Sequence, residues 1–296
     1  MMNDGTTRAY FGHHKCGSTM ILKIIEKVCR YMGIGHRHFH SPKIWGHDVN
    51  HLTFQAFAQQ EKLDFVSYTS ADARLIGDKT ALRGFHVVRD PRDIVVSSYF
   101  SHRYSHPTDG WPELVEFRKV LEKLPKDEGL LENMKFTAKL PIDGWTTDLF
   151  ETLKAWDYKS PNILELRFED IVASPYQSFL TIFEFLGLID GTDAHSLSSL
   201  LDISLYKLRS RHPQIPAIKR LEEIPGWVVL SFVYDNRFSK LSAGRKAGEE
   251  NVKSHYRKGE SGDWRNHFTD AHKAFFKSHY NDVLVRLGYE QDDRWD

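Results

Sequence analysis

The sequence predicts an α/β fold in three layers, in which helices cover both faces of a central, mainly parallel β-sheet. Two observations support this prediction: short apolar runs alternate along the chain with segments of helical periodicity, and polar, glycine-containing loops follow several of the apolar runs. Strands that alternate with helices favour a parallel sheet that is buried on both faces. Ligands bind such sheets beyond the carboxyl ends of the strands, so functional residues are expected in those loops.

The first strand and the first helix are the clearest of the predicted elements. An apolar run at 8–11 precedes a glycine-containing loop and a helix over 18–32. The residues at helical spacing that give this helix an apolar face are Ile21, Ile24, Ile25, Val28 and Met32. Further strands are predicted over 36–40, 64–70, 82–88 and 162–168. Further helices are predicted over 51–60, 91–104, most of 112–157, 175–186 and 269–287.

Size and composition indicate one globular domain over residues 1–296. Lys plus Arg equal Asp plus Glu at 40 each, and this balance argues against general nucleic-acid or membrane binding. The only cysteines are Cys16 and Cys29, and the first residues have no apolar signal segment. The longest apolar stretch, 227–234, is too short to span a bilayer. We therefore expect a soluble, cytoplasmic protein.

Two segments, 103–145 and 205–262, are rich in proline, glycine and charge and fit the sheet poorly. We expect them to run as excursions over the binding face. Long excursions in compact domains are often lids, and the alternative is that these two are ordinary surface loops.

The histidines do not predict a metal site, although there are 16 of them. The alternation of a strand places His36, His38 and His40 on one face. Metal ligation there needs a second element, and the sequence contains neither paired cysteines nor a His-Glu-x-x-His segment. We interpret these histidines as exposed or hydrogen-bonded and expect no metal.

The loop GHHKCGSTM at 12–20 has the features of a phosphate cradle. It joins a strand to a helix, where backbone N–H groups and the helix dipole favour an anion. A Walker A loop places lysine directly after its second glycine. Here Ser18 and Thr19 follow Gly17, and the lysine stands earlier, at Lys15. The loop is therefore P-loop-like but altered for chemistry other than ATP hydrolysis; the alternative is a tight turn built from small residues.

Two later segments add groups for a second phosphate. Arg89 ends a strand, and Ser97 follows two helical turns later, so an Arg fork and a hydroxyl are able to clamp one terminal phosphate. The alternative here is an Arg–Asp network that caps the helix. Farther on, Arg257 and Lys258 supply adjacent cations, and Gly259 allows a backbone N–H to approach an anion.

Together these segments resemble the sulfotransferase family that uses 3′-phosphoadenosine 5′-phosphosulfate (PAPS), in its cytosolic-type and bacterial branch. The resemblance covers residues 8–290 in the correct order. The first loop matches the family's Lys-x-Gly-[Ser/Thr]-Thr, and 89–97 matches its Arg followed by Ser at plus eight. RKGESGDWRNHF at 257–268 matches the family's C-terminal signature, and LRFED at 166–170 is similar to its Leu-x-Tyr-Glu-Asp segment.

This resemblance implies a P-loop-like fold and transfer of a sulfuryl group from PAPS to a hydroxyl or amine of a small molecule, without a metal. In the family, Met20 corresponds to a Trp that stacks on the adenine, and Phe168 corresponds to a Tyr. The donor-binding residues that the resemblance implies are Lys15, Cys16, Gly17, Ser18, Thr19, Met20, Arg89, Ser97, Phe168, Ser204, Arg257, Lys258 and Gly259.

The resemblance also implies catalytic roles. Lys15 is expected to neutralise the bridging oxygen of the donor as it leaves. Many family members carry Lys-Thr-His after the third strand, but here the corresponding residues are Tyr68-Thr69-Ser70, which offer no base. We therefore predict His40 as the first candidate for the general base and Asp72 as the second.

The acceptor and the oligomeric state are not predicted by the sequence. Side chains in the excursions that are candidates for shaping an acceptor pocket are His102, Tyr104, His106, Trp111 and Trp145.

Two other functions are compatible with the strand–loop–helix pattern. A P-loop kinase predicts binding of ATP and Mg²⁺, but the displaced Lys15 and the Arg-Lys-Gly segment argue against it. The other alternative is a nucleotide-binding interaction domain that has lost catalysis, which the missing Lys-Thr-His leaves open.

Overall fold

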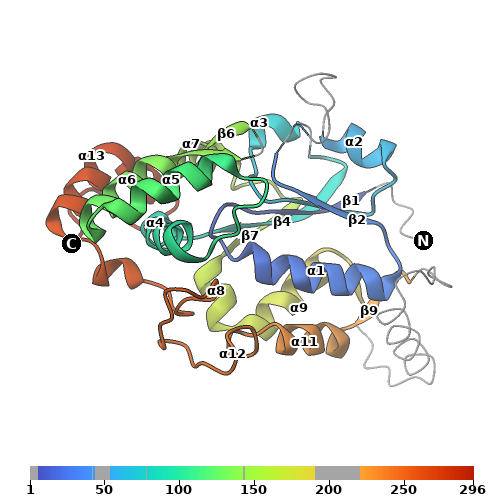
Figure 1. Ribbon diagram of the computed structural model, residues 1–296. Coiled ribbons are helices and arrows are strands. Elements are labelled where there is room, and N and C mark those ends of the chain that lie inside the picture. The colour runs from blue at the N-terminus through green and yellow to red at the C-terminus, as the bar shows by residue number, and fades with distance from the viewer. Residues whose placement is uncertain (1–5, 42, 44–53, 78, 143, 191–220) are drawn as a thin grey trace.

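The computed structural model describes residues 6–41, 43, 54–77, 79–142, 144–190 and 221–296. Five parallel strands form the central sheet in the order β2-β3-β1-β4-β7 (Figure 1). Their bounds are Thr7–Phe11 (β1), His36–Phe39 (β2), Phe65–Tyr68 (β3), Leu82–Val88 (β4) and Ile163–Arg167 (β7). The predicted parallel sheet is confirmed, and each of its strands lies where the sequence predicts one.

The remaining elements cover and extend this sheet. The helices are α1 (Ser18–Met32), α2 (Phe54–Gln60), α3 (Ala73–Ile76), α4 (Pro91–Phe100), α5 (Pro112–Lys123), α6 (Lys126–Ala138), α7 (Leu149–Ala155), α8 (Phe168–Ala173), α9 (Pro175–Phe185), α11 (Gly226–Asp235), α12 (Phe238–Leu241) and α13 (Asp270–Arg286). Two further helical turns are η2 (Ser101–Ser105) and η3 (Asp263–Asn266), and two short strand pairs are β5 (Lys139–Ile142) with β6 (Trp145–Asp148) and β8 (Ile189–Asp190) with β9 (Ile224–Pro225). In Figure 1, α1, α9 and α11 lie below the sheet, and α2, α3 and α7 lie above it.

The alternation of side chains along β1 explains why both faces of the sheet are covered. Every residue of β1 is buried. Tyr10 faces α1 and stacks on Phe85 with 4.8 Å between the ring centroids. Phe11 faces the opposite layer and packs on Phe54 and Trp156. A strand that is apolar on both faces requires helices on both sides of the sheet.

The parallel register brings the ends of all five strands to one edge. Phe11 is paired with Tyr68 and with His86, and Val88 is paired with Arg167. The loops that leave β1, β2, β3, β4 and β7 therefore start side by side at the carboxyl edge of the sheet. Ligands bind at this edge in open α/β sheets.

The described parts of the two predicted excursions contribute both to the folded body and to the binding pocket. Most of 103–145 is helical, because it contains α5 and α6, and α6 packs on α4 as part of the folded body. The segment 205–262 lies outside the described residues up to position 220, and its α11 packs on α1 and α9. The parts that line the binding pocket lie within 105–111 and 237–260, together with Ile142. A role of these two segments as lids stays a prediction.

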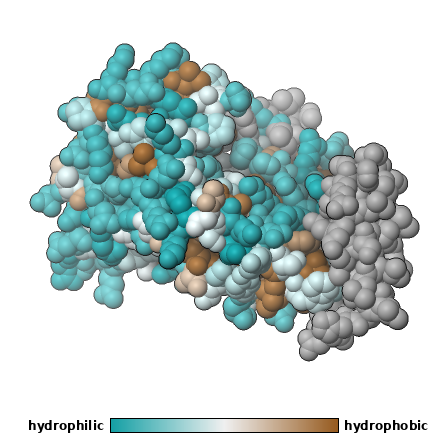
Figure 2. All heavy atoms as spheres, turned by 60° about the horizontal axis from the view of Figure 1, so that its bottom comes forward, coloured by the Kyte–Doolittle hydropathy of each residue, from teal (hydrophilic) through white to brown (hydrophobic). Residues whose placement is uncertain are grey.

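The surface of the described residues gives no sign of a membrane span. No helix among them is both long enough and apolar enough to cross a bilayer. Figure 2 shows one face of the molecule, which is mainly hydrophilic, with apolar side chains in small separate patches. Single exposed apolar side chains, such as Trp227 on α11, are normal for a globular protein.

Buried charges join α4 to the C-terminal part of the chain. The carboxylate of Asp93 accepts hydrogen bonds from the backbone N–H groups of Gly262 (2.6 Å) and Trp264 (3.0 Å). The neighbouring Arg92 forms ion pairs with Asp90 and Glu290 and lies 3.9 Å from the centroid of the Trp264 ring. The alternative interpretation of Arg92 and Asp93 as a structural network is therefore correct for these two residues.

We predict that Asp93→Ala lowers the free energy of unfolding by about 3 kcal/mol, because it leaves the buried N–H of Trp264 and the partly buried N–H of Gly262 without an acceptor. Asp270→Ala is the control, since Asp270 is fully exposed at the start of α13, and its effect is expected to stay within about 0.5 kcal/mol. Urea unfolding measures both variants. Equal stabilities of the two variants would contradict the role assigned to Asp93.

Candidate active site

The candidate site is a pocket of about 690 Å³ at the carboxyl edge of the sheet. This volume is in the range of sites for small molecules and cofactors. Its walls come from the loop after β1, from Arg89 and the second half of α4, from α8 and from the segments 105–111 and 237–260. The three predicted phosphate-binding segments therefore meet in one place.

The loop after β1 presents the start of α1 to the pocket. Gly17 is the N-cap residue of α1, with φ 81°, and no side chain caps the helix. A Cβ at this position would lie 2.4 Å from the Phe168 ring, so both the backbone conformation and the space require glycine. Because no side chain occupies the first N–H groups of α1, they are available to an anion.

The hydroxyl groups of this loop are held by specific partners. Ser18 Oγ lies 3.1 Å from the hydroxyl of Tyr10, and Thr19 Oγ1 lies 3.0 Å from Nε2 of His255. Both side chains line the pocket. His255 belongs to the C-terminal loop, so this contact joins the first loop to the segment that lies opposite it.

Arg89 connects the first loop to α4. Its Nη1 donates to the carbonyl oxygen of Lys15 at 3.0 Å, and its guanidinium lies 4.9 Å from the centroid of the Phe168 ring. Its Nε is buried and has no hydrogen-bond partner among the described residues. Ser97 lines the same pocket two turns into α4, as its spacing from Arg89 predicts. This arrangement suits a bound anion that receives the unused N–H of Arg89.

The C-terminal loop is held in place by carboxylates. Arg257 forms ion pairs with Glu250 and Asp263, and Lys258 Nζ lies 2.7 Å from Oδ1 of Asp263. Gly259 has φ +72°, and a Cβ there would lie 2.6 Å from the Phe238 ring. The loop is therefore fixed before any ligand binds, with Arg257, Lys258 and Gly259 lining the pocket.

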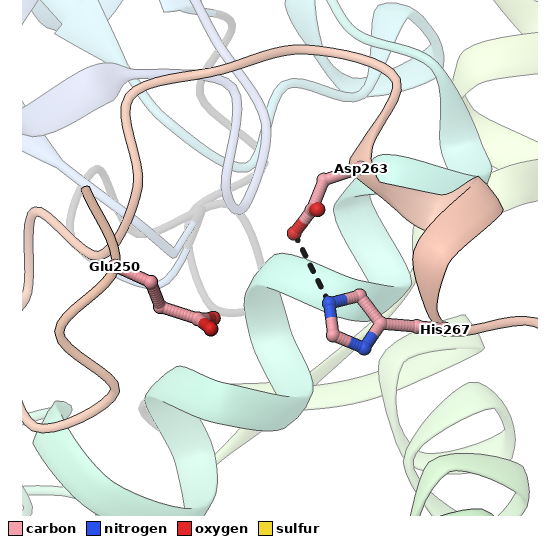
Figure 3. A group of neighbouring side chains, drawn as sticks. All are labelled: Glu250, Asp263 and His267. Carbon is pink, nitrogen blue, oxygen red and sulfur yellow. Dashed lines mark hydrogen bonds and ion pairs between the residues drawn. The ribbon is translucent and has the colours of Figure 1, made fainter. Parts of the chain in front are cut away.

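Glu250, Asp263 and His267 form the one group among the described residues with the spacing of metal ligands (Figure 3). Figure 3 shows His267 directed at Asp263, and Nε2 of His267 lies 3.1 Å from the Asp263 carboxylate. Burial raises the pKa of Asp263, but hydrogen bonds, first from His267 and then from Lys258, outweigh it and hold the pKa far below its usual value. Since Arg257 and Lys258 already neutralise these carboxylates, the group serves as a brace for the loop.

The electrostatics of the pocket centre on Lys15. Its backbone has φ 63°, a left-handed conformation that is uncommon for a residue with a side chain. Burial, followed by the guanidinium groups of Arg89 and Arg257, lowers the pKa of Lys15 to about 7. No described carboxylate pairs with its ammonium group. An anion in the pocket therefore meets a cation that no carboxylate of the described residues neutralises.

The two predicted bases differ in their surroundings. His40 lines the pocket, and its Nδ1 lies 2.6 Å from Oγ1 of Thr69. Asp72 caps α3 and does not line the pocket. Its carboxylate accepts two hydrogen bonds from Arg74, from Nε at 2.8 Å and from Nη2 at 2.6 Å. The geometry therefore gives no support to catalysis by Asp72, whereas His40 stays a prediction.

Two histidine pairs adjoin the first loop, one buried and one partly buried, and sequence reasoning did not predict them. His13 Nε2 lies 2.8 Å from Nε2 of His86, whose Nδ1 lies 2.6 Å from the Glu165 carboxylate. Burial lowers the pKa of both histidines well below the usual value and raises that of Glu165 to about 8. On the other side, His14 Nε2 lies 3.0 Å from Nε2 of His102. The one sequence signal was the pair of adjacent histidines at the start of the loop.

The other predicted site residues fall into two groups. Cys16 is fully buried, its side chain does not line the pocket, and its N–H donates to His13 O at 3.2 Å, so its predicted place at the donor is limited to shaping the loop. Ser204 lies outside the described residues. The predicted donor-binding residues that do line the pocket are Lys15, Gly17, Ser18, Thr19, Met20, Arg89, Ser97, Phe168, Arg257, Lys258 and Gly259.

Of the side chains considered for an acceptor pocket, His106 and Trp111 line the cavity. His102 lies behind His14, Tyr104 is exposed, and Trp145, in β6, is not among the lining residues.

The family to which this arrangement belongs follows from sequence comparison. The profile described as the sulfotransferase domain matches residues 11–213 and 219–288. The chain belongs to the sulfotransferase family. The predicted resemblance is therefore confirmed, and the match includes every segment that lines the pocket.

Curated sulfotransferases resemble the chain at low identity. Sulfotransferase 1E1 of Cavia porcellus is 25% identical over 203 residues, which are 67% of this chain and 53% of that protein. Sulfotransferase 2A6 of Mus musculus is 25% identical over 239 residues, which are 80% of this chain and 63% of that protein. The chain thus spans between 53% and 63% of the length of these relatives.

Solved structures confirm the predicted P-loop-like fold. Mouse sulfotransferase SULT7A1, complexed with PAP, aligns with a TM-score of 0.54 at 16% identity, over 97% of this chain and 87% of that chain. Retinol dehydratase, in a complex with retinol and PAP, aligns with a TM-score of 0.53 at 15% identity, over 94% and 81%.

We predict that Gly17→Ala destabilises the protein more than Gly244→Ala does. Both glycines have positive φ, so each substitution costs about 1 to 2 kcal/mol of backbone strain. A Cβ at Gly244 meets no atom within 4 Å, whereas at Gly17 it meets the Phe168 ring. Urea unfolding should show that the extra cost at Gly17 disappears when Phe168 is also changed to Ala. An extra cost that persists in the Phe168→Ala background would contradict the packing described.

Proposed function

We propose that the chain transfers a sulfuryl group from PAPS to a hydroxyl or amine of a small-molecule acceptor and releases adenosine 3′,5′-bisphosphate (PAP). The observation that carries this proposal is that two sets of groups suited to anions line one pocket. The first consists of Lys15 and the uncapped start of α1, and the second of Arg89, Ser97 and the loop with Arg257. A nucleotide that carries phosphates at both its 3′ and 5′ positions matches two such sets of groups.

The contacts suggest how the donor lies. Ser18, Thr19 and the N–H groups of α1 are suited to the 5′-phosphate, because they surround the positive end of the helix dipole. The Nε of Arg89, buried without a partner among the described residues, is suited to the 3′-phosphate, with Ser97 beside it. Phe168 and Met20 line the pocket between apolar neighbours, where a base ring is able to stack.

The proposed reaction is an in-line displacement at sulfur. The acceptor attacks as the bond from sulfur to the bridging oxygen breaks, and negative charge develops on that oxygen. Lys15 lines the pocket and is the residue proposed to neutralise this charge. Catalysis then depends on positioning and electrostatics supplied by the protein's own side chains.

A small-molecule acceptor is supported by two considerations. The pocket volume leaves room for a compact second molecule beside a nucleotide. The solved structures that resemble this chain include retinol dehydratase complexes with retinol and with androsterone. We propose a cytoplasmic location, because both cysteines are buried and free.

Kinase activity with ATP is the less favoured alternative. The position after Gly17 holds Ser18, and Lys15 stands on the other side of the glycine. Arg257 and Lys258 supply cations to a part of the pocket where a kinase requires none.

Calorimetry with PAP, ATP and ATP plus Mg²⁺ tests the proposed function. We expect PAP to bind at least about 100-fold more tightly than ATP, because the 3′-phosphate gains charged hydrogen bonds from the Arg89 region. We expect Mg²⁺ to leave the affinity for ATP unchanged. Tight binding of ATP with Mg²⁺ and none of PAP would refute the proposal.

The pKa of Lys15 gives a prediction for pH dependence. In the free protein Lys15 loses its proton near pH 7, and a bound anion holds the proton. The affinity for PAP is therefore expected to fall as pH rises above about 7, by up to about tenfold per pH unit. Lys15→Arg keeps its charge throughout this range, so its affinity should stay level. If the affinity for PAP falls equally with pH in both proteins, Lys15 is not the titrating group.

A further inference from the structure

The side chain of His14 lies in the wall of the pocket, directly before Lys15 in the chain. It is partly exposed, and its ring stacks on His102 with 5.1 Å between centroids and meets Trp111 edge-on at 5.9 Å. Its Nδ1 has no hydrogen-bond partner among the described residues, whereas its Nε2 contacts His102. One nitrogen is therefore held by the protein and the other is left for a ligand.

A chain of hydrogen bonds behind His14 starts at a backbone carbonyl group. Asn133 Nδ2 donates to Val95 O at 3.0 Å and to Ser98 Oγ at 2.7 Å. Asn133 Oδ1 lies 2.8 Å from Nδ1 of His102, and Nε2 of His102 lies 3.0 Å from Nε2 of His14. Asn133 and His102 are fully buried, so water does not compete for these contacts.

This series of hydrogen bonds fixes the position of each proton. A carbonyl oxygen only accepts, so the Asn133 nitrogen must face Val95 and its oxygen must face His102. His102 therefore donates from Nδ1. Burial lowers the pKa of His102 to about 3, so the ring is neutral and its Nε2 carries a lone pair. His14 must donate to that lone pair from Nε2, which leaves a lone pair on His14 Nδ1.

We propose that His14 Nδ1 is the general base that takes the proton from the acceptor's hydroxyl or amine, and that His102 and Asn133 are positioning residues that keep this nitrogen unprotonated. The proposal rests on the proposed sulfuryl transfer. It assigns the role that the missing Lys-Thr-His leaves open to a residue of the first loop.

The proton and electron balance of the step is complete. The acceptor oxygen or nitrogen forms a bond to sulfur as its proton moves to His14 Nδ1. The bond from sulfur to the bridging oxygen breaks, and that oxygen keeps the electron pair beside the ammonium group of Lys15. The imidazolium of His14 then releases its proton to water after the products leave.

The charges around His14 make this role dependent on the bound donor. Burial and then His102, Lys15, His106 and His40 lower the pKa of His14 well below its usual value. The free protein therefore holds His14 neutral. The negative charges of a bound phosphosulfate offset Lys15, so the basicity of His14 rises when the donor is in place.

His40 is less suited to the role than His14. Its Nδ1 shares the hydroxyl of Thr69, which also lies 3.3 Å from the carbonyl oxygen of Phe39. That hydroxyl has one proton and two acceptors, so the contact does not fix which nitrogen of His40 is protonated. We choose His14 because a series of hydrogen bonds to Asn133 and His102 fixes its lone pair.

A first experiment determines the protonation of His14 directly. Long-range ¹H–¹⁵N NMR of the full chain, with His14→Gln for assignment, reports which ring nitrogen carries the proton, with and without PAP. We expect the Nε2–H form in wild type and a mixture of forms in His102→Phe, which keeps the stacked ring but loses the hydrogen bond. An Nδ1–H form in wild type would overturn the proposal, even where no acceptor is known.

A second experiment measures turnover of PAPS with 2-naphthol or, where naphthol is not accepted, with water as the hydroxyl acceptor. His14→Ala should lower turnover about 100-fold or more and leave the affinity for PAP unchanged, and added imidazole should restore part of the rate. His279→Ala, on the exposed face of α13, is the control and should match wild type.

Acceptors of different acidity separate a base from a structural residue. The fall in turnover caused by His14→Ala should be smaller with 4-nitrophenol as the acceptor, because 4-nitrophenol is already ionised in mildly alkaline buffer and needs no base. Full turnover in His14→Ala, or an equal loss of PAP affinity, would overturn the proposal. Failure of wild type to bind PAP would instead refute the proposed function, so the two failures are distinguishable.

Discussion

The buried carboxylate of Asp93 is the contact on which the geometry of the site depends. The first loop and Arg89 are neighbours because β1 and β4 are adjacent strands, but the loop with Arg257 comes from the far end of the chain. Asp93 holds that loop at the start of α4 by accepting two backbone N–H groups. Because the Asp93 carboxylate is almost completely buried, the position of the loop is determined by folding and does not wait for a ligand.

In the pocket, the groups suited to donor binding are cations, whereas the groups suited to proton transfer are neutral histidines. Cations gather where the donor's phosphates are expected, and their carboxylate partners lie behind the C-terminal loop, away from the pocket centre. The histidines beside the first loop are neutral, because burial and Lys15 disfavour their charged forms. A neutral imidazole next to a cationic cradle is a suitable proton acceptor once an anionic donor offsets the cation.

Local patterns in the sequence predicted the parts of the fold that depend on neighbouring residues. The apolar runs gave the five strands, and the glycine between Lys15 and Ser18 indicated the turn that Gly17 makes. The contacts of His14 could not be predicted in this way, because its partner His102 lies 88 positions away and is reached only through the sheet order and the packing of α6 on α4. Asp72 was predicted from its place after β3, but its carboxylate is occupied by Arg74.

The central claim is that the pocket binds one nucleotide through its 3′-phosphate and its 5′-phosphate. Calorimetry that compares PAP with adenosine 5′-monophosphate tests this claim most directly, in wild type and in Arg89→Ala. We expect wild type to bind PAP about 10- to 100-fold more tightly than the monophosphate and the Arg89→Ala variant to lose most of that difference. Equal affinities for the two nucleotides in wild type would contradict the account.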